Sequence, residues 1–567
     1  MRPSDLRYSP PLSAAFSVLA LIGGLYIVAT TVLMVMDGWS ALPFSDQWDE
    51  LILDPGGLSL RWLFAQHNEH RILFPKLLFA IDAFAFSETN RFNFFCNLAL
   101  PAILAALLIW IARRNDNHGI FDTAWLAGVV LATLFSALQW ENFLWGFQVQ
   151  FFGVDLAVAA GIAWLVLGGS GVWSLAAAII CEAIAVFTLS SGAVMLPLAI
   201  VLAFLAGRSK AQILALVVVA AALMAVYLHG YVHPPGHADP LVSLHRPMRL
   251  ILHALVDLGS PIGHGVAYLK IGNPQRLSAL FGFIGFVLYG LAVLVYLGRF
   301  RPISGPPLAF LGIAGYSIGF TLLAGSGRIN FGLGQALSPR YNTPTLLFWL
   351  CLFLLAAVEL RPLRPGPPLA MRCAGFAVAV GFVFGQHAAV KTGLEWAEPR
   401  RTATAALLAG VYDRDALFSV YPPDPARVAR LADALRERRL SIFADDWGTW
   451  RGTPLFDHVA GADPARCRGG IDRVVSLPAA GSEGRQMIGW SWDDAAGQAA
   501  RRIVLADDGG RVVGYGLGGY PAGKPGRFRR SDWRGYYRAA ADVPITAYAL
   551  VDGGRAACPL ARWQEAR

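Results

Sequence analysis

The chain has 567 residues, of which 55% are hydrophobic and only 15% are charged, and its mean hydropathy is +0.49. Soluble proteins carry roughly 25% charged residues, so this composition excludes an ordinary soluble protein and indicates a polytopic membrane protein. The net charge of +9 does not indicate nucleic-acid binding, because the basic residues form no single stripe and gather instead in short connectors between apolar segments.

Eleven apolar segments are predicted to be membrane spans, since about 20 apolar residues cross a bilayer as a helix. The first is expected to stay uncleaved, because it is too long for the hydrophobic region of a signal peptide. Several are short and could be tilted or re-entrant. The expected spans cover residues 12–36, 92–112, 121–138, 151–168, 172–189, 193–207, 211–228, 278–298, 306–324, 345–360 and 369–386.

The basic residues of the connectors predict the orientation of these spans. Cytoplasmic loops of membrane proteins are enriched in Lys and Arg. If the N-terminus is cytoplasmic, the Arg-rich connectors all fall inside, and four longer polar loops fall on the opposite side, with everything after about residue 386. The connectors contain Arg113 and Arg114, Arg208 and Lys210, Arg299 and Arg301, and Arg361 and Arg364; the outer loops are 37–91, 139–150, 229–277 and 325–344. We therefore expect the functional face to be external.

The chain divides near residue 390 into a helical membrane domain, 1–390, and a soluble external domain, 391–567, which begins helical and continues β-rich. Residues 427–440 have apolar residues at helical spacing and predict an amphipathic helix. The segment 501–517 alternates around a DDGG turn and predicts a hairpin. Further strands are expected at 471–477, 486–492 and 545–553, with Cys467 before the first strand and Cys558 after the last. A disulfide between these two cysteines is plausible outside the cytoplasm.

The first outer loop begins with SDQWDE, residues 45–50. Asp46 and Asp49 lie three residues apart, so a helical turn would place both carboxylates on one face. A carboxylate there could act as a general base, and the pair could hold a divalent cation such as Mg²⁺ or Mn²⁺. The alternative is structural: Ser45 and Asp46 as a helix cap, and Trp48 as an anchor at the membrane interface.

A second polar cluster, QHNEHR, spans residues 66–71. His67 and His70 could bind a metal ion at i,i+3 spacing, with Glu69 between them. The same side chains could bind sugar hydroxyls or a phosphate, with Arg71 as the charge partner. A hydrogen-bond network that only ties down the loop explains the cluster nearly as well.

Two later outer loops hold further candidate residues. Arg328 and Arg340 lie in the loop before an apolar span, where an arginine can grip a lipid-linked phosphate or simply extend to the interface. Tyr341 fits a sugar platform or an aromatic belt. The loop 139–150 mixes aromatic rings with amides that include Gln148, which suits carbohydrate, although an interfacial aromatic belt is equally consistent with it.

Several familiar motifs are absent from the sequence. It has no G-x-x-x-x-G-K-[ST] phosphate loop, no G-x-S-x-G elbow and no paired C-x-x-C. Nucleotide-driven transport and serine hydrolysis are therefore disfavoured.

In layout and motifs the chain resembles the bacterial polytopic glycosyltransferases of the GT-C superfamily, which use polyprenyl-phosphate-linked sugars. The resemblance rests on the acidic motif DQWDE in the first outer loop, directly after the first span, and on Leu73 to Phe86 as a second, membrane-surface helix of that loop. It continues with several short spans, the late outer Arg340 and a soluble outer domain. It covers residues 12–386 as architecture.

The resemblance implies a mechanism at the outer face of the bacterial inner membrane. Asp46, with Asp49 as its rival, would be the base that activates a hydroxyl of a glycan, glycolipid or protein acceptor. That hydroxyl would attack the anomeric carbon and displace polyprenyl phosphate with inversion, while Arg340, with Arg328 or Arg71, would stabilise the leaving phosphate. Some relatives need a divalent metal and others do not. The D-x-x-D spacing departs from the adjacent acids or D-x-D of the simplest family pattern.

Three other functions are consistent with the sequence. A transporter or flippase for lipid-linked sugars would favour charged residues deep within spans and two related halves, but Glu182 is the one clear mid-span acid and no repeat is visible. A scaffold for envelope assembly would tolerate loss of the candidate residues. A membrane acyltransferase could use the His residues as bases.

Overall fold

A computed structural model describes residues 10–53, 58–114, 120–234, 243, 245–298, 305–359, 369–477, 484–521, 530–540 and 542–564. The chain forms two compact units. The first comprises Met1–Asp37, Ser59–Leu78 and Asn93–Leu394, and the second comprises Gly38–Leu58, Phe79–Phe92 and Glu395–Arg567. The last part of the second unit begins at Glu395, close to the expected boundary near residue 390, but this unit also includes two parts of the first outer loop.

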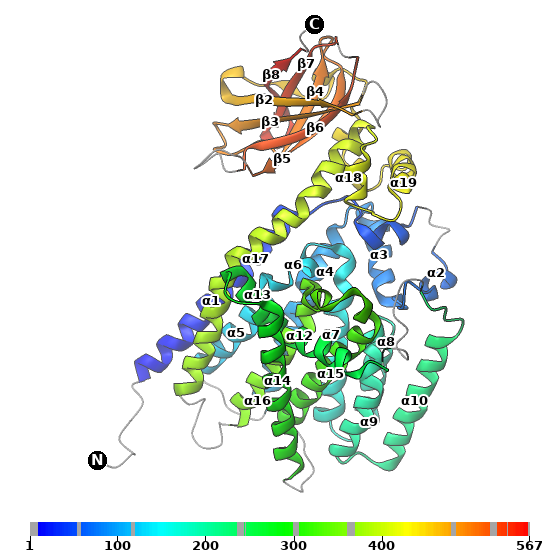
Figure 1. Cartoon of the computed structure of the whole chain (residues 1–567), viewed down its shortest axis with the longest axis vertical. Coiled ribbons are helices and arrows are strands. Elements are labelled where there is room, and N and C mark those ends of the chain that lie inside the picture. Colours follow the sequence, from blue (N-terminus) through cyan, green and yellow to red (C-terminus); the bar gives the residue numbers. More distant parts are fainter. Residues whose placement is uncertain are drawn as a thin grey trace. The chain divides into compact units, whose positions relative to one another are not determined.

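The first unit is helical (Figure 1). Helix α3 and the long helix α17 each begin in the first unit and end in the second, whereas α4 begins in the second and ends in the first. The last residue of α1, Gly38, also belongs to the second unit. The helices are α1 (Pro10–Gly38), α2 (Leu60–Phe64), α3 (Leu73–Phe86), α4 (Arg91–Arg113), α5 (Ile120–Leu134), α6 (Trp140–Phe143), α7 (Val149–Leu167), α8 (Val172–Val186), α9 (Met195–Leu205), α10 (Lys210–Leu228), α12 (Pro247–Leu258), α13 (Ser260–Leu269), α14 (Pro274–Leu297), α15 (Pro306–Arg328), α16 (Asn342–Glu359) and α17 (Leu369–Ala409).

Nine of the described helices are long and apolar enough to cross a membrane, which indicates a multi-pass membrane protein. Two of the eleven expected spans correspond to the shorter apolar helices α8 and α9. The pair α12 and α13, which lies in the expected outer loop 229–277, is bent by 64° and would be a tenth span if the two helices crossed together. The sequence did not indicate this pair, because its apolar residues cover only one side of α12.

Loop segments that were expected on one side of the membrane contact one another in the first unit. Gln66 pairs its side chain with the backbone of Val232, and Asn142 donates a hydrogen bond of 2.8 Å to the carbonyl of Arg340. Two basic connectors also share a location: Arg114 and Arg208 both donate to backbone carbonyls near the C-terminus of α7. Arginines commonly satisfy such terminal carbonyls. The connectors that contain Arg301, Arg361 and Arg364 lie outside the described residues.

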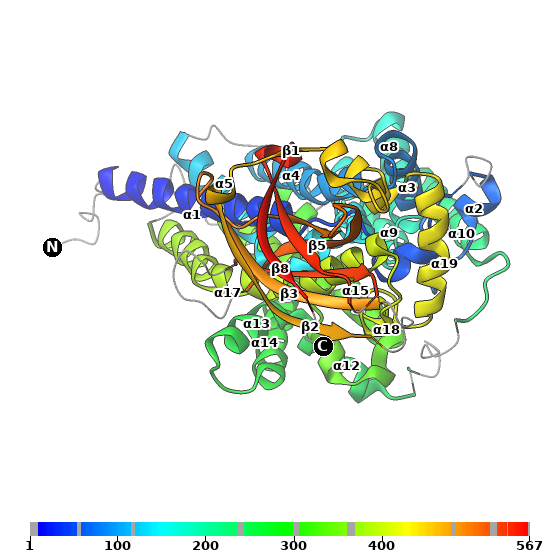
Figure 2. The ribbon, with the colours of Figure 1, turned by 90° about the horizontal axis from the view of Figure 1, so that it is seen from above.

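The second unit contains the 3-10 helix η2 (Ser45–Asp49), the end of α17, two short helices and one curved sheet of eight strands with the order β1-β8-β7-β4-β5-β6-β3-β2. Figure 2 shows its long strands bending as they cross the sheet. The helices and strands are α18 (Arg414–Phe418), α19 (Pro425–Glu437), β1 (Ala460–Gly461), β2 (Cys467–Ser476), β3 (Gly484–Asp493), β4 (Arg502–Asp507), β5 (Val512–Tyr520), β6 (Asp532–Arg538), β7 (Ile545–Val551) and β8 (Ala556–Trp563).

The sheet is buried on both faces, which explains the apolar run of its central strand β4. Ile503 and Leu505 pack into one core with Trp533 and Cys558. Val504 packs into the other core, which also contains Trp48 and the apolar residues at the end of α17. Because successive side chains of a strand point to opposite faces, a strand covered on both sides needs hydrophobic residues throughout. Because Trp48 is buried in this core, the segment Gly38–Leu58 belongs to the second unit.

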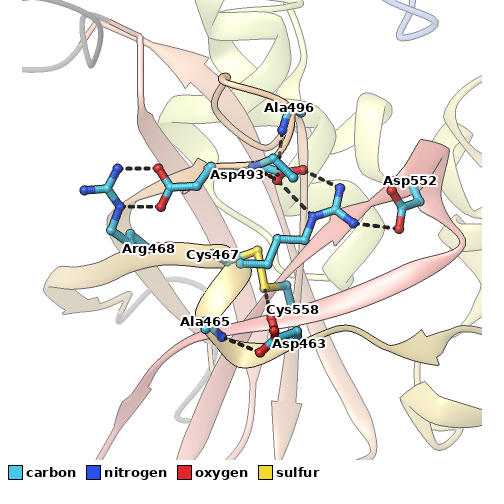
Figure 3. The surroundings of a disulfide bond; sticks show 11 residues. Asp463, Ala465, Cys467, Arg468, Asp493, Ala496, Asp552 and Cys558 are labelled. Carbon is cyan, nitrogen blue, oxygen red and sulfur yellow. Dashed lines mark hydrogen bonds and ion pairs between the residues drawn. A yellow bond between two sulfur atoms is a disulfide. The ribbon is translucent and has the colours of Figure 1, made fainter.

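A disulfide links Cys467 of β2 to Cys558 of β8 (Figure 3). The cysteines lie within strands, which corrects the expectation that they precede the first strand and follow the last. Arg466 and Arg468, on either side of Cys467, form ion pairs with Asp493 and Asp494. The disulfide therefore joins one edge strand of the sheet to the strand next to the opposite edge.

Candidate functional site

The SDQWDE motif forms the 3-10 helix η2, so Asp46 and Asp49 lie one turn apart on the same side. Neither structural alternative for this motif agrees with the structure. The residue at the N-cap is Phe44, whose backbone N–H donates to the side chain of Gln47 at 3.1 Å. Trp48 is only 1% exposed and belongs to the core of the second unit, so it is no interfacial anchor.

The two carboxylates of η2 differ in their surroundings. Asp49 Oδ1 accepts hydrogen bonds from Arg427 at 2.6 Å and from the hydroxyl of Tyr421 at 2.9 Å. Burial, followed by the contact with Asp49, raises the pKa of Tyr421 to about 12. Asp46 is half-buried, and its Oδ1 accepts a hydrogen bond from Ser45 Oγ at 3.3 Å. An incoming hydroxyl would have to displace Arg427 to reach Asp49 Oδ1.

The QHNEHR cluster forms a tight turn in the first unit. The backbones of His67 and His70 exchange two hydrogen bonds of 2.8 Å, and Asn68 at the tip has φ of 48°. Asn is one of the few residues that adopts this left-handed conformation readily. The ring of His67 packs on Phe147 at 5.1 Å, whereas His70 Nδ1 accepts from the backbone N–H of Ser190 at 3.4 Å. The turn is not helical, so the spacing that suggested a shared metal ion does not hold.

Glu69 and Arg328 form the centre of the polar site in the first unit. Arg328 Nη2 lies 2.5 Å from Glu69 Oε1, and His70 Nε2 lies 3.4 Å from the same oxygen. The side chains of Arg328 and Glu69 remain 21% and 23% exposed. Because His70 Nδ1 accepts a hydrogen bond, the neutral tautomer carries its proton on Nε2 and can donate it to Glu69. A cation, a carboxylate and an imidazole thus meet at the end of α15, within reach of solvent.

Arg71 has a structural role in this arrangement. Its buried guanidinium donates to three backbone carbonyls, those of Phe64, Tyr227 and His229. The bonds to Tyr227 and His229 hold the turn against the end of α10, and the bond to Phe64 holds it against the end of α2. This agrees with the structural alternative for Arg71 and not with a role as phosphate ligand.

A second ion pair lies where residues 139–142 meet residues 340–343. Arg340 Nη1 contacts Glu141 Oε1 at 3.1 Å, and its side chain is 26% exposed. Asn142 and Thr343 share a hydrogen bond of 2.6 Å, and Thr343 donates to Gln139 at 2.5 Å. These contacts join α6 and the residue before it to the start of α16, and they leave part of Arg340 accessible.

The residues expected to form a sugar platform or an aromatic belt are buried. Tyr341 packs between Phe151 and Phe320, with ring centroids 6.3 and 5.9 Å away. Gln148 is also buried, and its Oε1 has no hydrogen bond to any described residue. The whole segment 139–150 is buried. An aromatic belt would lie at the surface, so that interpretation is wrong.

Of the candidate metal ligands, Asp46 and Asp49 lie together on one side of η2. Within the described ranges, no three His, Cys, Asp or Glu side chains form a group that could hold a metal ion.

Buried acids in the first unit were missed by the sequence analysis. Asp155 on α7 and Asp257 on α12 are as fully buried as Glu182 on α8, and none of their carboxylate oxygens has a hydrogen bond to a described residue. His253, one turn before Asp257, is buried without partners in the same way. Glu182 is therefore not the one mid-span acid. Asp155 lies inside the expected span 151–168 and could have been found; Asp257 was hidden in an expected loop.

Comparisons with known proteins add no relative to this description. No protein-family model matches the chain, and no curated protein matches its sequence.

Proposed function

We propose that the protein is a membrane glycosyltransferase that transfers a sugar from a polyprenyl-phosphate donor to an acceptor hydroxyl. The observation that carries this proposal is the Glu69–His70–Arg328 cluster, in which an arginine at the end of an apolar helix remains partly exposed beside a carboxylate and an imidazole. Few environments suit a lipid-linked phosphate better than a cation at the end of a membrane span, where the lipid chain can stay in hydrocarbon.

The cationic role falls to Arg328 and Arg340. Each forms a partly exposed ion pair, with Glu69 and with Glu141. A phosphate could take the place of the carboxylate on either guanidinium, because both anions fit its planar donors. Cationic groups next to the leaving phosphate would stabilise the negative charge that develops as the glycosidic bond breaks.

The resemblance to the GT-C superfamily implies that Asp46 is the base. It would accept the proton of the acceptor hydroxyl as that oxygen bonds to the anomeric carbon and polyprenyl phosphate leaves with the electron pair of the broken bond. The acceptor would be an envelope glycan, glycolipid or protein. The disulfide between Cys467 and Cys558 supports an extracytoplasmic second unit, because disulfides persist in oxidising compartments.

The test is a transfer assay with the purified full chain in lipid vesicles and a panel of radiolabelled polyprenyl-phosphate sugars. Asp46→Asn should abolish transfer, Asp49→Asn should reduce it less, and Arg328→Ala and Arg340→Ala should each lower it by about 10²–10³. Arg430→Ala, an exposed arginine of α19, is the matched control and should leave transfer unchanged. Equal activity in the wild type and Asp46→Asn would refute the role of Asp46, and an absence of donor consumption would refute the enzyme.

Transport of lipid-linked sugars is a second candidate function, favoured by one group of observations. Three acids and one histidine are buried without partners in the first unit, and α12 and α13 are apolar helices bent by 64° at the break between them. Buried ionisable residues and interrupted helices are typical of transporters. The same vesicles distinguish the two functions: labelled donor lipid that crosses the bilayer without loss of its sugar would establish transport and not transfer.

A further inference from the structure

Asp155 is the most anomalous of the buried acids. It lies in the middle of α7, is 1% exposed, and neither carboxylate oxygen makes a hydrogen bond to a described residue. No arginine, lysine or histidine among the described residues forms an ion pair with it. An isolated carboxylate in surroundings of low dielectric constant is so costly that the group becomes neutral instead. The geometry therefore requires Asp155 to carry a proton.

Two packed helices contribute titratable groups next to Asp155, and a 3-10 helix contributes a hydroxyl next to one of them. Tyr316 of α15 is close enough to influence its charge, and Cys351 of α16 is the other titratable neighbour. The 3-10 helix η6 (Ser190–Val194) contributes Ser191, whose Oγ lies 3.2 Å from the hydroxyl of Tyr316. Tyr316, Ser191 and Cys351 are all buried. A carboxyl, a phenol and an alcohol thus lie in sequence inside an otherwise apolar region.

This chain of polar groups leads toward the Glu69–His70–Arg328 cluster. The residue before Ser191, Ser190, donates its backbone N–H to His70 Nδ1 at 3.4 Å. His70 is 17% exposed. The buried carboxyl is therefore connected through two neighbouring residues of η6 to a side chain that meets solvent.

We propose that Asp155, Tyr316 and Ser191 form an internal proton-binding site, whose proton exchanges with the polar end of the first unit through Ser191. Each group in this transfer gains one proton for each proton that it loses, except Asp155, which loses one. After a rotation of the carboxyl, Asp155 passes its proton to the oxygen of Tyr316 as Tyr316 passes its own to Ser191, and Ser191 releases one to water beside His70. Asp155 is left as a carboxylate, and return of a proton along the same path reverses each step. The site is independent of the proposed glycosyl transfer.

Infrared difference spectroscopy of the full chain in lipid vesicles tests this proposal directly. The protein is labelled with ¹³C at the aspartate side-chain carboxyls, and spectra of Asp155→Asn are subtracted from those of the wild type at neutral pH. We expect the difference spectrum to contain the carbonyl stretch of a protonated carboxylic acid. The ¹³C label should shift the frequency of this band, and D₂O should shift it further. A difference that contains only a carboxylate stretch overturns the proposal. Asp494→Asn, which removes an ion-paired surface carboxylate, is the matched control and should give only that signal.

Two further variants test the pathway and remain informative if Asp155→Asn does not fold. Tyr316→Phe should keep the protonated-acid band but change its frequency, because the neighbouring phenol is lost. Ser191→Ala should slow the exchange of the Asp155 proton with D₂O by about tenfold or more, as expected for a modest added barrier. Exchange at the wild-type rate in Ser191→Ala would overturn the route, and an unchanged frequency in Tyr316→Phe would overturn the site.

Discussion

Three buried acids of the first unit and two ion-paired acids of the second unit lie in opposite environments. In the first unit, Asp155, Glu182 and Asp257 are buried with no cation and no hydrogen bond among the described residues. In the second unit, Asp49 and Asp493 each accept bonds from an arginine. Charged groups in water gain from such pairs, whereas an acid surrounded by hydrocarbon is most stable when it is neutral.

This difference shows that one residue type can stabilise one unit and destabilise the other. A carboxylate paired with a planar guanidinium contributes charge-assisted hydrogen bonds. A buried acid without partners lowers stability and is retained for a function. Substitutions of these buried acids and of these paired acids should therefore change stability in opposite directions.

The largest expected effect comes from the disulfide of the second unit. Cys467 and Cys558 are separated by 91 residues, and a loop of that length predicts a loss of roughly 4–5 kcal/mol of unfolding free energy when the link is removed. In the variant Cys467→Ser/Cys558→Ser, hydrogen exchange of peptides from β2 and β8 should become much faster. Cys373→Ser, a free cysteine of α17, should leave this exchange unchanged; unchanged exchange in the double variant would contradict the prediction.

Asp493→Asn should destabilise the sheet by about 1.5–3 kcal/mol, the range for hydrogen bonds to charged groups. Asp493 accepts two bonds from Arg466, at 3.0 and 2.9 Å, and two more from the backbone of Ala495 and Ala496. Hydrogen exchange of β3 in the full chain measures the effect. If the protection of β3 is the same as in the wild type, the pair contributes nothing.

The ion pair between Asp493 and Arg466 makes the stability of the sheet depend on pH. The hydrogen bonds and charge of Arg466 lower the pKa of Asp493 below its ordinary value, which is about 3.9 in an unfolded chain. The stabilisation is therefore present above about pH 4 and is lost as the pH falls through the folded-state pKa. Protonation slows a phosphine reductant itself as the pH falls, so its rate is measured relative to an exposed peptide disulfide at each pH. On that scale Cys467–Cys558 should be reduced faster as the pH falls. Asp493→Asn should make the rate of reduction depend less on pH. An equally steep pH dependence in this variant would show that Asp493 is not its cause.

Glu182→Met should stabilise the first unit by about 1–2 kcal/mol, because an apolar side chain of similar volume replaces a buried polar group without partners. Thermal unfolding of the full chain in detergent measures the change. Glu182→Gln, which keeps a polar group there, is the matched control and should stabilise less. A lower melting temperature for Glu182→Met would show that Glu182 has a stabilising partner.

The smallest effect is expected for Arg430→Ala in α19. Arg430 pairs with Asp424 at 3.2 Å, but the side chains are 66% and 45% exposed, and such surface pairs contribute about 0.5 kcal/mol or less. Asp424→Ala should cost more, about 1 kcal/mol, because Asp424 also caps α19 through the N–H of Arg427. Hydrogen exchange of α19 should separate the two variants; equal effects would contradict the role of the cap.

The sequence alone predicted those elements whose pattern of apolar and polar residues follows from contact with hydrocarbon or with water. The apolar spans follow from the need to cover hydrocarbon, and helix α3 has the bounds expected from the sequence, Leu73 to Phe86. Strands β4 and β5 were indicated by the DDGG turn between them. Strands β6 and β8 were missed, because β6 contains two arginines and a glycine and β8 contains Pro559, all poor strand signals.

The candidate site was predicted in part. The sequence identified Glu69, Arg328 and Arg340, but Glu69 and Arg328 are 259 residues apart, and only the packed helices bring them together. The conformation of residues 66–71 depends on Asn68 in a left-handed turn, which a pattern of polar letters does not reveal. Asp257 was missed because α12 has charged residues on one side and was taken for part of a loop.

The position of the disulfide has a mechanical consequence. Cys467 lies at the start of β2 and Cys558 within β8, so strands β3 to β7 belong to a covalent ring. Tension applied between α17 and any load attached after Cys558 would pass through the sulfur atoms and bypass those five strands. These five strands would therefore carry no load under pulling force and would not unravel, for as long as the disulfide stays oxidised.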